Sequence, residues 1–203
     1  MDLPQKVTAS QVAHSQSDEY FDKVIKKPSF IRGKADSVDR GTAHHIFLQY
    51  CDFEKAREDI GAELERLEKL GRLTPEQAQS IDTQNLSKAL SGELFDRVIN
   101  ADKVYREERF TAKIHPSLLD EKYKDIDKSV GIIMQGAVDL AFVENGKLVI
   151  VDYKTDRVRE LEKLRALYQK QLELYSEALS NSLEIEVVEL IIYSIHLNEY
   201  IVL

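Results

Sequence analysis

Two aspartates and a lysine lie in the segment from Gly136 to Asp156, GAVDLAFVENGKLVIVDYKTD, with a spacing suited to chemistry on a phosphate group. The central Asn145-Gly146 pair is typical of a two-residue type I′ turn, and apolar runs flank it on both sides. The segment therefore predicts a β-hairpin in which Glu144 pairs with Lys147, and this first pair sets the register of the pairs beyond it.

That register places Asp139 directly opposite Asp152, and Ala137 opposite Lys154. Because side chains alternate between the faces of a strand, Asp152 and Lys154 share one face, and Asp139 joins them from the neighbouring strand. Like charges directly opposite each other destabilise a sheet, so a fold retains them more readily when a cation lies between them. Mg²⁺ prefers oxygen ligands and usually binds one or two carboxylates together with substrate phosphates. These residues therefore predict metal-assisted hydrolysis of a phosphodiester.

The alternative is that both aspartates are solvated residues on the open face of a hairpin. Apolar side chains occur on both faces of the two strands, at Val138, Leu140, Phe142, Leu148, Val149, Ile150 and Val151. Such a pattern is typical of a sheet that is covered on each side. Carboxylates buried near each other need a partner, which favours the metal site.

A long amphipathic helix is predicted from Arg159 to Leu179, directly after the hairpin. Its apolar face consists of Leu164, Leu167, Tyr168, Gln171, Tyr175 and Ala178. Gln171 is polar within this face, and a buried amide needs hydrogen-bond partners. Gln171 is therefore either a core glutamine with a satisfied amide, or part of a Gln-x-x-x-Tyr pair with Tyr175 beside the metal site.

Two adjacent histidines, His44 and His45, follow Gly41-Thr42-Ala43 near the start of another predicted helix. Successive residues of a helix point about a quarter-turn or more apart, so we do not expect both histidines to serve one site. A histidine here is more often a solvated or core residue than a ligand. The small residues Gly41 and Ala43 favour a close approach of another backbone or a ligand.

Helical patterns dominate the first half of the chain. Residues 1–35 are polar and poorly periodic, and we interpret them as a linker or extension from a larger polypeptide, ahead of a domain at 36–203. Helical segments are predicted at 37–52, at 53–71 with Gly71 as a C-terminal stop, from the Thr74-Pro75-Glu76-Gln77 capping box, and at 85–101 as one or two helices.

Strand patterns dominate the second half. Strands are predicted at 105–115, in the hairpin, at 186–196 and at 200–203. A helical half followed by β-β-β-α-β indicates an α+β (or α/β) fold in which the long helix covers one face of the sheet.

The chain has 203 residues, a net charge of −8, a pI near 5.2 and a single cysteine. This net charge is unfavourable for holding nucleic acid by bulk electrostatics, so such a substrate would need a local basic strip, a metal ion or a partner that delivers the strand. One cysteine, Cys51, excludes an intrachain disulfide, a Cys₄ zinc site and a Cys-ligated iron–sulfur cluster. We expect a cytoplasmic location, because the sequence lacks a membrane-spanning apolar run and a signal-peptide core.

Four motifs follow one another in the order typical of RecB-type nucleases of the PD-(D/E)XK superfamily, which the chain resembles over about residues 28–197. They are Gly41-x-x-x-His45, GAVD ending at Asp139, Asp152-Tyr153-Lys154-Thr155, and Gln171-x-x-x-Tyr175. The similarity is greater to the nuclease domains of AddA-type helicase–nuclease subunits. Their RGTAxHxxxQ opening is matched by Arg40 to His45 with Gln49, and their Arg-Glu-x-x-Phe strand by Arg106, Glu107 and Phe110.

The resemblance implies a restriction-endonuclease-like mixed sheet flanked by helices, and a Mg²⁺- or Mn²⁺-dependent exodeoxyribonuclease that degrades single strands at broken DNA ends. It implies that His45, Asp139 and Asp152 bind the metal, with the Tyr153 carbonyl as a further ligand. Lys154 would orient or activate water or stabilise charge on the phosphate, as a cation beside developing negative charge does in general. Gln171 and Tyr175 would support the site.

The implied partners are single-stranded DNA, the helicase part of the same chain and an AddB-like partner, without a membrane. The expected DNA contact is a short basic strip of Arg157, Arg159, Lys163 and Arg165. The chain lacks a Gly-x-x-x-x-Gly-Lys-Ser/Thr phosphate loop and so has no visible motor. Two alternatives stay open: a stand-alone phage or mobile-element exonuclease of the same superfamily, and a catalytically silent module that docks a helicase or recombinase.

Overall fold

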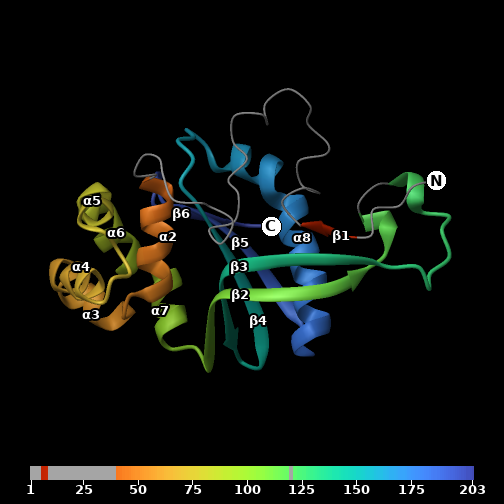
Figure 1. Cartoon of the computed structure of the whole chain (residues 1–203), viewed down its shortest axis with the longest axis horizontal. Coiled ribbons are helices and arrows are strands. Elements are labelled where there is room, and N and C mark those ends of the chain that lie inside the picture. Colours follow the sequence, from red (N-terminus) through yellow and green to blue (C-terminus); the bar gives the residue numbers. More distant parts are fainter. Residues whose placement is uncertain (1–5, 9–39, 119–120) are drawn as a thin grey trace.

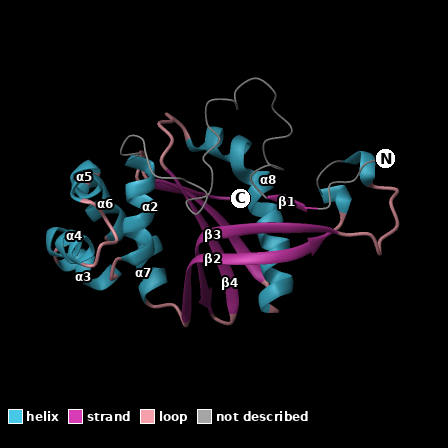
Figure 2. Cartoon of the chain, viewed as in Figure 1, coloured by secondary structure: helices cyan, strands magenta, loops and turns pink. Residues whose placement is uncertain are grey.

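A six-stranded mixed sheet with helices on both faces forms the centre of the molecule (Figures 1 and 2). The computed structural model describes residues 6–8, 40–118 and 121–203. Its α-helices are α2 (Arg40–Tyr50), α3 (Phe53–Glu58), α4 (Ile60–Lys69), α5 (Pro75–Ser80), α6 (Thr83–Leu90), α7 (Glu93–Ile99) and α8 (Leu161–Leu183). Its strands are β1 (Lys6–Thr8), β2 (Lys103–Ile114), β3 (Ile132–Glu144), β4 (Lys147–Lys154), β5 (Val187–Ser194) and β6 (Glu199–Val202).

The long strand β3 organises the sheet. One edge of β3 pairs antiparallel with β2. The other edge pairs antiparallel with β4 from Leu140 to Glu144 and parallel with β1 from Ile133 to Gln135. On its other side β4 pairs with parallel β5, and β6 closes the sheet antiparallel to β5. The α8 helix connects β4 to β5, because two parallel neighbours require a long crossover. The predicted α+β fold with a mixed sheet is confirmed.

Each face of the sheet is covered by its own apolar cluster. Figure 1 shows α2 to α7 gathered on the left of the sheet and α8 lying against it on the other side. The α8 side buries Phe110, Met134, Val138, Ile150, Leu174 and Leu179, and the other side buries Phe47, Leu67, Phe95, Phe142, Val151 and Ile191. Covering on both faces accounts for the apolar character of the hairpin strands. The side chain of Asp152 is only 6% exposed, so the solvated alternative is wrong for this residue.

Local signals explain where the helices begin and end. The predicted capping box forms, since the Thr74 hydroxyl accepts the Gln77 N–H at 3.2 Å and the Gln77 amide oxygen accepts the Thr74 N–H at 2.9 Å. Gly71, just beyond α4, has a φ of +65°. The segment 53–71 is two helices rather than one continuous run, because Asp59 is extended and its carboxylate caps α4 by accepting the Ala62 N–H at 2.9 Å.

A strand at Lys6–Thr8 was not expected, because this part of the chain is polar and short of periodic apolar residues. It pairs in parallel with Ile133 to Gln135 of β3 and therefore joins the sheet. β3 correspondingly begins at Ile132, before the predicted start of the hairpin. Most of the predicted extension and the start of the 37–52 helix lie outside the described residues. Within those residues, no helix combines the length and apolar character needed to cross a membrane.

Candidate active site

The α2 helix directs its two histidines to different places. Ala43 and Phe47 are fully buried and hold the helix against the sheet. His45 Nδ1 lies 3.4 Å from a carboxylate oxygen of Asp139, with 28% of the His45 side chain exposed. His44 is buried, and its Nε2 accepts the backbone N–H of Asp82 at 3.4 Å. Of the two histidines, His45 therefore faces the candidate site.

The hairpin opens at the predicted aspartate pair. The register from Glu144–Lys147 out to Leu140–Val151 is as predicted, but the paired stretch ends there, one position before the aspartates. The Asp139 carboxylate instead accepts the backbone N–H of Tyr153 at 2.8 Å.

The predicted pairing of Ala137 with Lys154 is wrong, because the pairing of β3 with β4 ends at Leu140–Val151. On their other edges, Ala137 pairs with Arg109 of β2 and Lys154 pairs with Ser194 of β5. The cause lies in Asp139, since its carboxylate takes a backbone donor that the regular ladder would have paired with a carbonyl.

Glu107 of β2 lies beside Asp139 of β3, at the point where the regular structure of both strands is interrupted. Regular β2–β3 pairing continues on either side, at Arg106–Leu140 and Glu108–Val138, but Glu107 has a left-handed φ of 48°. Tyr105 and Phe110 consequently pack on the same α8 side, although an ordinary strand would place them on opposite faces. Strained backbone of this kind concentrates at functional sites.

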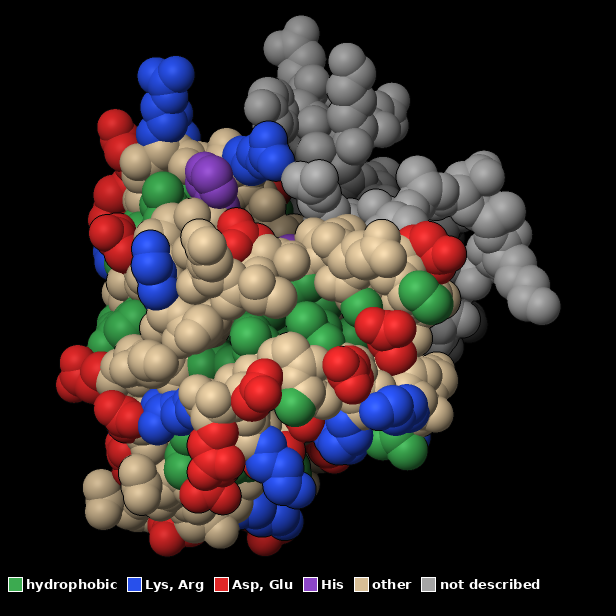
Figure 3. Space-filling view, turned by 90° about the vertical axis from the view of Figure 1, so that its left-hand side faces the viewer, with side chains coloured by type: hydrophobic (Ala, Val, Ile, Leu, Met, Phe, Trp, Pro, Cys, Tyr) green, Lys and Arg blue, Asp and Glu red, His purple; other side chains and the backbone are tan. Residues whose placement is uncertain are grey.

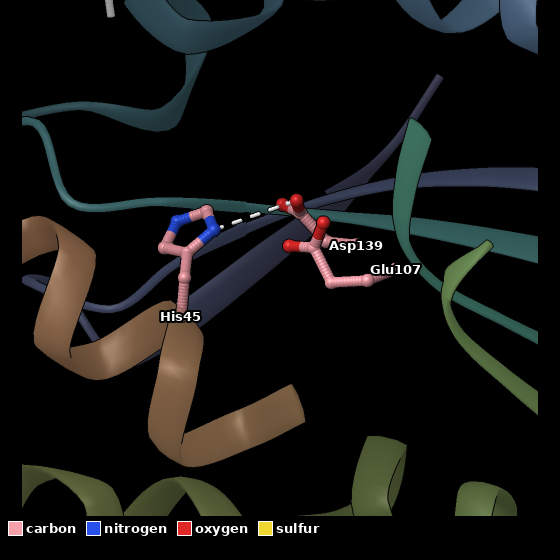
Figure 4. A group of neighbouring side chains, drawn as sticks. All are labelled: His45, Glu107 and Asp139. Atoms are coloured by element: carbon pink, nitrogen blue, oxygen red, sulfur yellow. Dashed lines mark ion pairs between the residues drawn. The ribbon is translucent and has the colours of Figure 1, made fainter. Parts of the chain in front are cut away.

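His45, Glu107 and Asp139 together offer one nitrogen and two carboxylate oxygens that all lie within 4.8 Å of one another. Figure 4 shows the His45 ring of α2 directed toward the carboxyl groups of Glu107 and Asp139, which lie next to each other. A carboxylate-rich set suits Mg²⁺ or Mn²⁺. Glu107 was not predicted as a ligand, and its only sequence signal was the Arg-Glu-x-x-Phe resemblance.

Burial and neighbouring charges shift the pKa values of the acidic groups and of His45 in the site. Burial raises the pKa of Asp152 to about 6, against the opposing effect of Lys154, and burial with the Asp139 charge raises the pKa of Glu107 to about 7. Burial alone would raise the pKa of Asp139, but His45, Lys154 and the Tyr153 N–H together outweigh burial and hold that pKa below its usual value. Burial likewise opposes protonation of His45, yet Asp139 raises its pKa. Acids that stay partly protonated near neutral pH fit a site that gains a divalent cation.

Lys154 lies deep in the site between two partners. Its ammonium is 2.5 Å from Asp152 Oδ2 and 3.8 Å from the centre of the Tyr168 ring. Only 13% of the Lys154 side chain and 6% of the Asp152 side chain are exposed. Asp152 thus pairs with Lys154 and is not part of the three-residue ligand group. To act as the predicted ligand, the Asp152 carboxylate would have to contact Lys154 and the metal ion at the same time.

Gln171 and Tyr175 form a buried pair on α8, as their spacing predicts. The Gln171 amide donates to the Tyr175 hydroxyl at 2.7 Å, and the Tyr175 ring packs edge-on against Phe110 at 5.3 Å. Gly136 allows this packing, because a Cβ there would lie 2.5 Å from the Phe110 ring and 3.1 Å from Tyr175. Burial, together with the Asp152 charge, raises the pKa of Tyr175.

Arg106 fixes the strand that carries Glu107 to the end of the helix that carries His45. It donates to the Cys51 carbonyl just beyond α2, and its guanidinium carbon lies 3.7 Å from the centre of the Phe53 ring. The contact between the two elements therefore sets the position of His45 relative to Glu107.

The predicted basic strip follows β4 and continues onto the start of α8. Arg157, Arg159 and Lys163 are exposed. Arg165 is engaged within the protein instead, donating to the Val202 carbonyl at 2.9 Å and pairing with Glu162 at 3.5 Å. Figure 3 views the end of the molecule formed by α3 to α6 and shows acidic and basic side chains interspersed around hydrophobic ones. That end offers no continuous basic surface among its described residues.

Comparison with known proteins gives matches over almost the whole chain. Residues 19–198 match the sequence model of the PD-(D/E)XK nuclease superfamily. The chain is 33% identical over 215 residues to the A subunit of an ATP-dependent helicase/nuclease from Clostridium botulinum (strain Kyoto / Type A2), a match that covers 98% of this chain and 17% of that protein. It is 33% identical over 196 residues to the protein of the same name from Ruminiclostridium cellulolyticum, covering 87% of this chain and 15% of that protein.

The chain thus spans less than a fifth of the length of these curated relatives. A solved structure described as the crystal structure of SSO0001 aligns with 100% of this chain and 68% of its own, at 11% identity and a TM-score of 0.42. Likeness at that level adds nothing on function.

Proposed function

Because the chain belongs to the PD-(D/E)XK nuclease superfamily, we propose that it hydrolyses DNA phosphodiester bonds with a bound divalent cation, Mg²⁺ or Mn²⁺. By analogy with the names of its relatives, it serves as the exonuclease domain within the A subunit of an ATP-dependent helicase/nuclease. Its place of action is the cytoplasm, in double-strand-break repair and recombination. The observation that carries the proposal is the His45, Glu107 and Asp139 ligand group, with the Lys154–Asp152 pair in the same electrostatic environment.

His45, Glu107 and Asp139 would hold the cation, with Asp152 and the Tyr153 carbonyl as further ligands. A divalent cation bound there lowers the pKa of a water molecule and neutralises charge on the phosphate. Ligands must be unprotonated, so the protein has to release protons from Glu107 and Asp152 and keep His45 neutral when the cation binds. The pKa values of about 7 for Glu107 and about 6 for Asp152 make that release possible near neutral pH.

Lys154 supplies the fixed positive charge. Its ammonium cannot ligate a cation, but it can stabilise negative charge that develops on the phosphate oxygens. Because only 13% of its side chain is exposed, solvent screens this interaction less than at a surface. Gln171 and Tyr175 support the site from α8, where a buried hydrogen bond joins their side chains.

Delivery of the DNA strand to the site depends on other parts of the helicase–nuclease. A net charge of −8 gives weak long-range attraction for DNA, and Arg157, Arg159 and Lys163 form only a short basic strip. The helicase part of the same chain, together with an AddB-like partner, would feed single strands to the site and raise their effective concentration. The isolated chain should therefore cut slowly, without ATP, and with strong salt dependence.

Two alternatives make different predictions. A catalytically silent docking module would not need the ionisable group of His45, Glu107, Asp139 and Lys154. A stand-alone phage or mobile-element exonuclease would digest duplex ends rapidly by itself. The relatives, whose names join helicase and nuclease, favour the helicase-fed domain.

The test is cleavage of an end-labelled single-stranded oligonucleotide by the 203-residue chain in Mg²⁺, in Mn²⁺ and in EDTA. We expect cation-dependent cleavage that Asp139→Asn and Asp152→Asn abolish. Lys154→Ala should lower turnover by about 100-fold or more, as loss of one group that stabilises the transition state does, while cation binding stays nearly unchanged.

Asp125→Asn is the matched control, because Asp125 is exposed in the connection between β2 and β3. Circular dichroism of each variant establishes that it is folded. Cleavage that persists in EDTA or in Asp139→Asn would contradict the proposal, and no cleavage by a folded, cation-loaded chain would favour the docking module.

A further inference from the structure

The Tyr168 ring is a partner of Lys154 that the proposed chemistry does not yet use. The Lys154 ammonium lies 3.8 Å from the centre of this ring, well inside the range of a cation–π interaction. Tyr168 is 9% exposed and packs among Leu164, Leu172 and Ile192, so little water competes for the ring face. Desolvation of this kind strengthens the attraction between a cation and an aromatic ring.

A second contact fixes the orientation of the ring. The Tyr168 hydroxyl donates to Asp156 Oδ2 at 3.2 Å, and Asp156 follows β4 two residues after Lys154. The ring is thus held from α8 by packing and from the end of β4 by a hydrogen bond. Burial and the neighbouring Asp156 raise the pKa of Tyr168 to about 12, although Lys154 opposes this, so the phenol stays neutral at neutral pH.

Asp152 and Tyr168, the two partners of Lys154, would respond differently to a bound divalent cation. Asp152, at 2.5 Å, carries a negative charge that a divalent cation in the neighbouring ligand group would attract. The Tyr168 ring carries no net charge, binds no divalent cation in this position and takes up no proton. It can hold the ammonium in place without neutralising it.

We propose that Tyr168 is a positioning residue for Lys154: its ring face holds the ammonium toward the phosphate when Asp152 engages the cation. This inference rests on the proposed nuclease function, since it assigns the ring a role in turnover. The competing interpretation is that Tyr168 is an ordinary core aromatic whose ring only fills space.

The test varies the negative electrostatic potential of the aromatic face at position 168. Tyr168→Phe keeps the face, Tyr168→Leu removes it, and trifluorophenylalanine at position 168 keeps the ring while weakening its negative face. We expect Tyr168→Phe to stay within about threefold of wild type in kcat, and the other two to lose roughly 5- to 30-fold, which is the range of cation–π energies. KM and the half-saturating Mg²⁺ concentration should change by less than about twofold, because a ring that acts only through Lys154 alters neither ground-state binding step.

Tyr123→Leu is the matched control. Tyr123 is also 9% exposed and lies 4.8 Å from the Lys122 ammonium, but it belongs to the connection between β2 and β3 at the right of Figure 1. It should lose stability without loss of kcat. Full kcat in the trifluorophenylalanine protein, or a loss confined to KM or to Mg²⁺ saturation, would overturn the proposal.

A second readout separates this inference from the nuclease function itself. The ε-methylene protons of Lys154, assigned by their disappearance in Lys154→Ala, should be shifted upfield by the Tyr168 ring and should stay so at saturating Mg²⁺. A return to the position of an exposed lysine with Mg²⁺ would overturn the inference even if wild type cuts DNA. A retained upfield shift in a chain that does not cut DNA would support the contact and contradict the proposed function alone.

Discussion

The carboxyl groups of Glu107 and Asp139 lie next to each other on neighbouring strands, and with His45 they place three ligand atoms within 4.8 Å of one another (Figure 4). Two acidic groups this close repel each other when both are ionised, and the protein without a cation lowers that repulsion by keeping Glu107 partly protonated. The pKa of Glu107 rises to about 7 through burial and the Asp139 charge. This pair therefore links stability, pH and cation binding.

Glu107→Gln should stabilise the metal-free protein at high pH. The ordinary pKa of a glutamate is 4.5, and here it is raised to about 7, so folding loses stability as pH rises from the first value through the second. The gain from the substitution should be near zero at pH 4.5 and about 1–3 kcal/mol at pH 8, allowing for partial exposure. Urea denaturation in EDTA measures both values. Glu108→Gln on the same strand is the control. If Glu107→Gln changed the free energy of unfolding equally at pH 4.5 and pH 8, ionisation of Glu107 would not be the cause of the lost stability.

Cation affinity should rise steeply with pH. Glu107 and Asp152 must lose the protons that their pKa values of about 7 and about 6 retain, and His45, whose pKa is raised by Asp139 against the effect of burial, must be neutral. We expect Mn²⁺ to bind about tenfold or more tightly at pH 8 than at pH 6, with release of protons. Titration calorimetry in two buffers of different ionisation enthalpy counts those protons. An affinity that is the same at both pH values would argue against these ligands.

The two histidines should separate binding from stability. His45→Ala should weaken Mn²⁺ binding by about 10-fold or more, because it removes a ligand. His44→Ala should leave that affinity unchanged but lower the free energy of unfolding by about 1–3 kcal/mol, since its buried ring packs in the core and accepts the Asp82 N–H at 3.4 Å. Calorimetry and urea denaturation of both variants are the measurements. Loss of Mn²⁺ affinity in His44→Ala alone would show that the wrong histidine is assigned.

The basic strip should appear in the salt dependence of DNA binding. Replacing Arg157, Arg159 and Lys163 together by alanine should reduce the slope of log K against log salt by about 2, at roughly 0.7 per phosphate contact with a single strand. Arg165→Ala should change the slope little, because Arg165 pairs with Glu162 and the Val202 carbonyl. Fluorescence anisotropy with a labelled oligonucleotide in EDTA gives the slope without cleavage. Equal slopes for the triple variant and wild type would place the DNA elsewhere.

Local patterns were sufficient for the turn of the hairpin and for its inner pairs. The Asn145-Gly146 turn and the alternation around it predicted the register as far as Leu140–Val151, and the family membership suggested by the motifs is confirmed. The lysine and both aspartates are predicted from that hairpin, whereas the choice of His45 over His44 depends on the family resemblance. Their roles as ligands and catalyst stay predictions.

The remaining features depend on departures from regular structure. Glu107 reaches the site only because its left-handed φ of 48° interrupts the alternation of β2. The 2.8 Å contact from the Tyr153 N–H to Asp139 replaces a ladder bond that the pattern assumes. Tyr168 looks like any other member of the apolar face of α8, since only the folded chain shows which ring lies under Lys154. β1 is too short and polar to produce a periodic signal.

The most direct test of the proposed cation site is anomalous diffraction from crystals of the chain soaked in Mn²⁺. We predict a single strong peak bounded by His45, Glu107 and Asp139, and its loss in crystals of Asp139→Asn soaked in the same way. A strong peak elsewhere, or no peak at this position at saturating Mn²⁺, would contradict the assignment of the cation site.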